Sequence, residues 1–275
     1  MCREVDLHQA VLAKNDTSAG TLRAELAARG TSVINLLSGP GSGKTALLER
    51  ELLRARERDI PVAALTADLA TENDARRLAR SGVPVKQILT DGLCHLEAAM
   101  LGGHLDGWLP DDTRLLFVEN VGNLVCPASY DLGETLRVVL ASVTEGEDKP
   151  LKYPTAFGLA HLVVLTKTDI AEAAEFDEEA FRAHVAQVNP GVEVLPTSAR
   201  RGAGVGELLD RALAAADGGG VHQPVMAQRP PAHAHHHERH GHEHHHHDAA
   251  GLPTHPSDPA RGYVGAPGVA ARRRP

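Results

Sequence analysis

The stretch Gly39-Pro40-Gly41-Ser42-Gly43-Lys44-Thr45 decides the fold class of this chain. A short apolar run, residues 33–37, precedes it, and the leucines of residues 46–53 recur after it at helical spacing. This order of strand, glycine loop and helix is the setting of a P-loop, whose main-chain N–H groups turn toward phosphate oxygens. In this interpretation Lys44 contacts the β and γ phosphates of a nucleotide and the Thr45 hydroxyl binds Mg²⁺.

Composition narrows the class of protein. The chain has 275 residues, of which 42% are hydrophobic and 3% aromatic, so we expect an α/β core built from Leu, Val and Ala. No apolar run approaches the roughly 18 residues that span a membrane. The first residues form no hydrophobic signal region, so we expect a cytoplasmic protein without membrane contact. A net charge of −8 disfavours nucleic acid as a partner, and three cysteines do not suggest a disulfide framework.

The rest of the chain alternates between strand-like and helix-like segments. Strands are expected at residues 33–37, 61–66, 83–89, 115–118, 136–143, 161–165 and 192–195. Helices are expected at residues 16–29, 46–58, 71–78, 94–100, 177–188 and 204–216. The pattern predicts an α/β fold of the P-loop NTPase type, with a mostly parallel sheet of about seven strands covered by helices on both faces. We expect an N-terminal segment and helix at 1–30, a GTPase domain at 31–216, and a disordered tail at 217–275.

The nucleotide base is suggested by two loops that follow strands. Thr166-Lys167-Thr168-Asp169 resembles the [NT]-K-x-D signature of GTPases. There the Asp169 carboxylate would accept hydrogen bonds from guanine N1 and its amino group, which adenine cannot offer, and Lys167 would lie along the ring. Ser198-Ala199 resembles the loop that contacts the guanine oxygen. A strand-end lysine with a helix-capping aspartate is the structural alternative, but the order and spacing favour GTP over ATP.

Two acidic residues follow strands and could serve hydrolysis, which needs Mg²⁺, a positioned water and neutralised phosphate charge. Asp68 follows the strand after the P-loop helix, and Glu119 stands where GTPases usually carry D-x-x-G. Each could instead cap a helix. We predict Lys44, Asp68 and Glu119 as catalytic residues and Thr45, Asp68 and Glu119 as the magnesium ligands. The residue that activates water stays open.

A second group of residues has the chemistry of a metal site. Cys94, His95 and Cys126 offer two thiolates and an imidazole, which suit Zn²⁺ or Ni²⁺ and leave a fourth position open. Inert buried thiols are the alternative. Both cysteines follow strands, however, and ligands of open α/β sheets bind at the carboxyl ends of the strands. We therefore expect the metal close to the γ-phosphate.

The C-terminal segment is rich in histidine. Neutral imidazoles on a flexible chain can wrap Ni²⁺ or Zn²⁺, with affinity that falls below a pH of about 6.5. An expression tag or low-complexity drift are the alternatives, but other residues interrupt the run and more chain follows it. Ten of the chain's 17 histidines lie here, at His233, His235, His236, His237, His240, His242, His244, His245, His246 and His247.

Several segments together resemble the HypB family, the nickel-incorporation GTPases of [NiFe]-hydrogenase maturation. They are residues 38–45, 68–76, 92–98, 119–128 and 144–154, and the resemblance covers most of residues 17–216. Ser38, which replaces the first glycine of the general P-loop motif, is common in this family. The related urease accessory GTPase UreG is disfavoured because it carries Cys-Pro-His, whereas this chain has Cys94-His95 and a separate Cys126.

The resemblance implies a GTPase of the dimerising SIMIBI class that converts GTP to GDP and phosphate. It implies a metal site at Cys94, His95 and Cys126 near a homodimer interface, with other maturation proteins and the hydrogenase large subunit as partners. The leading hypothesis is a GTP-hydrolysing nickel metallochaperone. A nickel storage protein dominated by its tail is the alternative, and a P-loop small-molecule kinase is disfavoured by Thr166-Lys167-Thr168-Asp169. Whether the site holds Ni²⁺ or Zn²⁺ stays open.

Overall fold

A single all-parallel sheet is the centre of the molecule. The computed structural model describes residues 2–68, 73–90 and 92–228, so the tail histidines lie outside the described residues. The seven strands of this sheet follow the order β3-β2-β4-β1-β5-β6-β7. The strands are β1 Ser32–Ser38, β2 Val62–Asp68, β3 Val85–Leu89, β4 Leu115–Gly122, β5 Leu136–Ser142, β6 Leu162–Thr166 and β7 Val194–Pro196. The predicted α/β P-loop architecture is confirmed.

The strand that precedes the P-loop is buried on both faces. Successive side chains of a strand point to opposite faces. Accordingly, Ile34 and Leu36 pack into one apolar cluster, whereas Val33 and Leu37 pack into clusters on the opposite face. The run 33–37 is therefore apolar without alternation, as expected for the centre of a parallel sheet.

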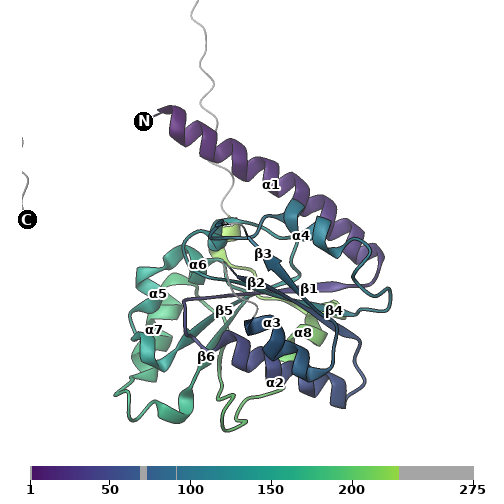
Figure 1. Cartoon of the computed structure of the whole chain (residues 1–275). Helices are drawn as coiled ribbons and strands as arrows, with labels where there is room; N and C mark the ends of the chain where they lie inside the picture. Colours follow the sequence, from purple (N-terminus) through teal and green to yellow (C-terminus); the bar gives the residue numbers. More distant parts are fainter. Residues whose placement is uncertain (1, 69–72, 91, 229–275) are drawn as a thin grey trace, which may run out of the picture. The chain divides into compact units, whose positions relative to one another are not determined.

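Helices cover each face of the sheet (Figure 1). The first face carries α2 Lys44–Glu57, α3 Asn73–Leu78 and α8 Glu207–Ala216. The second carries α1 Cys2–Ala28, α4 Ala98–Leu105, α6 Pro154–Gly158 and α7 Glu178–Val188, with α5 Lys149–Lys152 against α7. Short 3₁₀ turns are η1 Ala79–Ser81, η2 Pro127–Ser129, η3 Val143–Glu145, η4 Thr168–Ile170 and η5 Val225–Gln228. Within the described ranges, no helix has the length and apolar character needed to cross a bilayer.

The first helix begins much earlier than predicted. We expected Asp16 or Thr17 to cap it, but α1 begins at Cys2. Thr17 lies inside the helix, where its hydroxyl donates to the Ala13 carbonyl at 3.0 Å. A hydroxyl can satisfy itself within a helix in this way, so it is an ambiguous start signal. The residues before Asn15 lack an apolar period that would have revealed them as helical.

The helix that follows Cys94 begins later than predicted. Cys94 and His95 lie in the loop after β3, and α4 begins at Ala98. Glu97 is extended, with φ −109° and ψ 152°, and its side chain does not cap the helix. The Ala98 N–H instead donates to Asn15 Oδ1 of α1 at 2.9 Å. Because the cap comes from another helix, nothing near Cys94 in the sequence marks the true start.

The folded part of the chain extends beyond the boundary predicted at residue 216. Val221 packs against the apolar cluster beneath α2 and α8. His222 Nε2 forms a 2.8 Å hydrogen bond with Asn189 Oδ1. Residues 217–228 are therefore structured, and their disorder was wrongly predicted because they contain few apolar residues. Residues 229–275 lie outside the described part.

Candidate functional site

The P-loop forms an anion cradle at the carboxyl end of β1. Gly41 and Gly43 have φ of 73° and 93°, in the region that favours glycine, and Gly43 caps the start of α2. Main-chain N–H groups at a helix start attract phosphate. Residues 38–46 line a cavity of about 500 Å³ that is completed from the ends of β2 and β4. A cavity lined in this way can accept a phosphate chain.

Lys44 lies buried in this cavity. Its ammonium group donates to the main-chain carbonyl of Asn120 across 2.6 Å, and the residue is 7% exposed. Burial lowers the pKa of Lys44, while the nearby Glu119, Asp74 and Asp68 act in the opposite direction. A cation so placed can neutralise phosphate charge. The sequence did not identify the Asn120 carbonyl as part of the site.

Glu119 and Thr45 form a pair suited to a hard cation. The Thr45 hydroxyl donates to Glu119 Oε1 at 2.5 Å. Glu119 is 2% exposed, and burial raises the pKa of its carboxyl group. Its Oε2 is buried without a hydrogen-bond partner among the described residues. Asp68 lines the same cavity. The predicted residues Lys44, Thr45, Asp68 and Glu119 therefore come together around one cavity. The oxygen atoms of Thr45, Asp68 and Glu119 are the kind of ligand that Mg²⁺ prefers.

The loop at residues 166–169, which we expect to bind the nucleotide base, lies against the P-loop. The Thr166 hydroxyl donates to the Ser42 carbonyl at 2.5 Å, and Lys167 Nζ donates to the Gly41 carbonyl at 2.7 Å. Lys167 has φ of 59°, an uncommon conformation for a residue with a side chain, and this backbone opens the η4 turn that carries Asp169. The loop after β6 is thus fixed to the P-loop through two side chains.

A second cavity beside the P-loop has the character of a base pocket. Its volume is about 260 Å³, and its lining is mostly apolar, from residues such as Ala46, Leu47 and Ala199. Asp169 stands at this cavity and accepts a 2.6 Å hydrogen bond from the Ser198 hydroxyl, which lowers the pKa of Asp169. An ionised carboxylate facing an apolar slot can select a base that presents two donors. The two loops predicted from sequence therefore meet here.

One contact with the P-loop was missed. Glu145, in η3 after β5, accepts from the Ser142 N–H at 2.8 Å and from Lys149 Nζ at 2.7 Å. A Cβ at Gly39 would lie 2.7 Å from the Glu145 carboxylate, so a larger residue there would require this carboxylate to move. Residues 142–145 read S-V-T-E, a capping-box pattern from which this turn could have been predicted.

The cysteine loops lie next to each other. The Cys126 thiol lies close enough to Cys94 to interact with it and raises the pKa of Cys94. His95 Nδ1 lies 3.7 Å from Cys94 Sγ, and the His95 ring stacks on Tyr130 with centroids 3.9 Å apart. In the described part of the chain, no three His, Cys, Asp or Glu side chains are arranged to hold a metal ion. The three predicted ligands thus form a cluster, but not a complete ligand set within one chain.

The end of β4 touches both the P-loop and the Cys94 loop. A Cβ at Gly122 would lie 3.4 Å from the Cα of Pro40. The next residue, Asn123, donates from Nδ2 to the Cys94 carbonyl at 3.4 Å. The phosphate cavity and the thiol cluster are therefore neighbours.

The fold and the nucleotide site define a P-loop GTPase. Residues 32–196 match the model of the CobW/HypB/UreG nucleotide-binding domain. The chain belongs to this family, within its branch of HypB hydrogenase maturation factors.

Individual relatives agree with this placement. The chain is similar to hydrogenase maturation factor HypB of Azotobacter vinelandii, with 50% identity over 210 residues that span 75% of this chain and 68% of the relative. The chain is also 45% identical to hydrogenase maturation factor HypB of Escherichia coli K12 over 208 residues, which span 76% of this chain and 71% of the relative.

Two crystal structures are also similar. HypB from Helicobacter pylori in complex with nickel gives a TM-score of 0.70 at 37% identity, covering 74% of this chain and 96% of that one. HypB from Archaeoglobus fulgidus gives a TM-score of 0.69 at 36% identity, covering 74% of this chain and 100% of that one.

Proposed function

We propose that this protein binds GTP with Mg²⁺ and uses GTP hydrolysis to release Ni²⁺ to [NiFe]-hydrogenase during its maturation. The observation that carries the proposal is the course of residues 119–126. They begin at the Thr45 hydroxyl, pass Pro40 of the P-loop, contact the Cys94 loop and end at Cys126. A related protein from H. pylori has been crystallised in complex with nickel.

The Lys44 ammonium supplies a physical route for coupling. It is bonded to the Asn120 carbonyl at 2.6 Å and lies inside the phosphate cavity. A γ-phosphate attracts this ammonium group and competes with the carbonyl for it. The carbonyl then loses its charged donor, and the end of β4 becomes free to shift. Thr45, Asp68 and Glu119 would hold Mg²⁺, whose positive charge would stabilise the negative charge of the phosphates.

The metal site is proposed to be completed by a second copy of the chain. Cys94, His95 and Cys126 cluster, but the described residues contain no complete ligand set within one chain. Leu93 and Val125, next to the two cysteines, are exposed apolar residues of the kind found in interfaces. A homodimer would bring the two clusters together. Ni²⁺ is the proposed cargo, and Zn²⁺ could occupy the same thiolates.

The coupling is tested by measuring Ni²⁺ affinity in the presence of GDP and of a non-hydrolysable GTP analogue. A coupling of about 1.4 kcal/mol would change the affinity tenfold. Lys44→Ala should abolish the difference. Lys86→Ala is the matched control, since Lys86 contacts the His104 carbonyl and Trp108, away from the P-loop. Equal affinities with the two nucleotides would overturn the coupling.

Nickel storage is the second candidate, favoured by the ten histidines between residues 233 and 247. A truncation that tests it should begin after Gln228, because residues 217–228 pack on the domain. Storage predicts that the truncation abolishes nickel tolerance while hydrogenase maturation survives in ample nickel. Delivery predicts that Lys44→Ala abolishes maturation whether or not the tail is present.

A further inference from the structure

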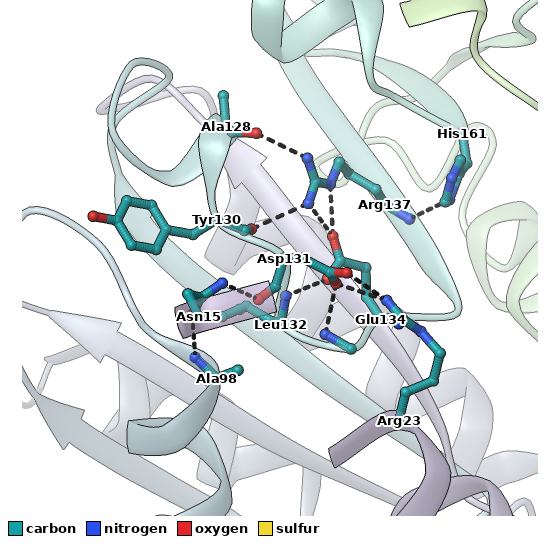
Figure 2. A network of polar contacts seen from close by, with 11 residues as sticks. Asn15, Arg23, Ala98, Ala128, Tyr130, Asp131, Leu132, Glu134, Arg137 and His161 are labelled. Carbon is teal, nitrogen blue, oxygen red and sulfur yellow. Dashed lines mark hydrogen bonds and ion pairs between the residues drawn. The ribbon is translucent and has the colours of Figure 1, made fainter. Parts of the chain in front are cut away.

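The two cysteine-bearing loops are joined by one side chain of the N-terminal helix. Asn15 of α1 donates from Nδ2 to the Asp131 carbonyl at 2.8 Å and accepts from the Ala98 N–H through Oδ1 at 2.9 Å (Figure 2). Asp131 belongs to the segment that follows Cys126, and Ala98 ends the loop that carries Cys94. Asn15 is 5% exposed, so water cannot readily replace either bond.

The segment that follows Cys126 is already fixed on its other side. Arg137 of β5 donates to the carbonyls of Ala128 and Tyr130 at 2.9 and 3.1 Å (Figure 2). The Glu134 carboxylate accepts from Arg137 Nε at 2.6 Å and from the Leu132 N–H at 2.7 Å. This network holds the segment to the sheet. Within the described residues, β5 makes no such hydrogen bonds to the Cys94 loop, which is held instead by Asn123, Tyr130 and Asn15.

Helix α1 also packs directly on this segment. A Cβ at Gly133 would lie 2.8 Å from the Ala19 carbonyl, so the helix and the loop meet backbone to backbone. Arg23 forms an ion pair with Asp131 at 2.7 Å, but both side chains are substantially exposed and the pair contributes little. Neither contact reaches the Cys94 loop. Asn15 does, because it also satisfies the first N–H of α4, a donor that the helix itself cannot pair.

We infer that Asn15 is a positioning residue of the nickel site, which sets the separation of the Cys94 and Cys126 thiols. This inference rests on the proposed function, in which those thiols bind Ni²⁺. Without Asn15, the Ala98 N–H and the Asp131 carbonyl both lose a buried partner. The start of α4 then loosens, and Cys94 loses one of the contacts that set its distance from Cys126, beside the Asn123 bond and the stacking of His95 on Tyr130. Residues that orient metal ligands commonly change metal affinity by about 10- to 100-fold when replaced.

The test compares the variants Asn15→Ala and Thr17→Ala in the full-length chain. Both also carry Cys2→Ser, so that Cys94 and Cys126 are the two remaining cysteines. Thr17 is an exposed residue of the same helix that bonds only within it, so it controls for the change in helix propensity. The first readout is the rate at which dibromobimane bridges Cys94 and Cys126, followed by fluorescence. The second is Ni²⁺ affinity, and the third is GTP affinity, which reports on the integrity of the fold.

Asn15→Ala should slow bridging and weaken Ni²⁺ binding by about tenfold while GTP affinity stays unchanged. Thr17→Ala should match the parent chain in all three. Asn15→Asp keeps an acceptor for Ala98 and loses the donor to Asp131, so an intermediate effect is expected. Unchanged bridging and Ni²⁺ affinity in Asn15→Ala would overturn the inference. Slower bridging in a chain whose parent does not bind Ni²⁺ would support the positioning role and overturn the proposed function.

Discussion

Thr45 donates its hydroxyl hydrogen to the Glu119 carboxylate across 2.5 Å, and so joins the first turn of α2 to β4. These residues are far apart in sequence. They meet because β4 pairs directly with β1, the strand that leads into the P-loop. Both the nucleotide site and its connection to the cysteine loops depend on this pairing.

Glu119→Gln should raise the Mg²⁺ concentration needed for GTP hydrolysis by about tenfold. Glutamine keeps an oxygen for the Thr45 hydroxyl but loses the charge that a hard cation prefers. The measurement is the Mg²⁺ dependence of phosphate release. Glu57→Gln, at the far end of α2 in an exposed ion pair with Arg54, is the control and should leave the dependence unchanged. An unaltered Mg²⁺ requirement in Glu119→Gln would contradict the ligand role.

Asp169→Asn should reduce GTP affinity by about 100-fold or more, because the two donors of guanine lose a carboxylate acceptor. The same change should improve binding of xanthosine triphosphate, whose extra carbonyl can accept from the new amide. Competition binding with the two nucleotides measures both effects. Ser198→Ala removes only the hydroxyl that holds Asp169 and should cost less. A variant that binds GTP as tightly as the parent would rule out guanine readout by this residue.

Glu51 should make stability fall as pH rises toward neutrality. This carboxylate of α2 is fully buried, accepts from the Gly206 and Leu209 N–H groups at the start of α8, and has its pKa raised by burial to about 7. Asp210 raises this pKa further, and Arg54 lowers it.

The sign follows from proton binding. Between the ordinary pKa of 4.5 and about 7, the folded state keeps a proton that the unfolded state has lost. The contribution of Glu51 to the free energy of unfolding is therefore fully present below pH 4.5. It decreases by about 3 kcal/mol as the pH rises through 7. Urea unfolding from pH 4.5 to 8 measures it, with Glu51→Gln as the variant. Identical pH profiles for the variant and the parent would show that Glu51 does not titrate in this way.

Arg137→Ala should destabilise the fold by about 3–5 kcal/mol, because it leaves the Glu134 carboxylate buried without its cation. The Arg137 and Glu134 side chains are only 10% and 3% exposed. Denaturant midpoints measure the loss. Arg23→Ala breaks the exposed pair with Asp131 and should cost less than about 1 kcal/mol. Adding Glu134→Gln to Arg137→Ala should recover part of the stability, and no recovery would argue against an uncompensated charge.

The sequence by itself determined the nucleotide-binding half of this protein. The glycines of the P-loop, the doubly buried strand at 33–37 and the loop at 166–169 have local requirements that few residue types satisfy. Glycine is favoured where φ is positive, as at Gly41 and Gly43, and a continuous apolar run is needed where a strand is covered on both faces. For these elements the residue types along the chain were sufficient.

Only the tertiary structure decided how the sites are joined. The start of α4 depends on a cap from Asn15. The first residues of α1 show no apolar period in the sequence, so their helical structure could not be predicted. The contact of Cys94 with Cys126 requires β3 and β4 to end at one edge of the sheet, and the Lys44 bond to Asn120 requires β1 beside β4. These contacts join residues distant in sequence. The placement of both cysteines after strands predicted that they lie near each other. The atoms that join the sites depend on burial and geometry that exist only once the sheet has assembled, so no local pattern could have revealed the Asn15 cap or the Lys44 bond.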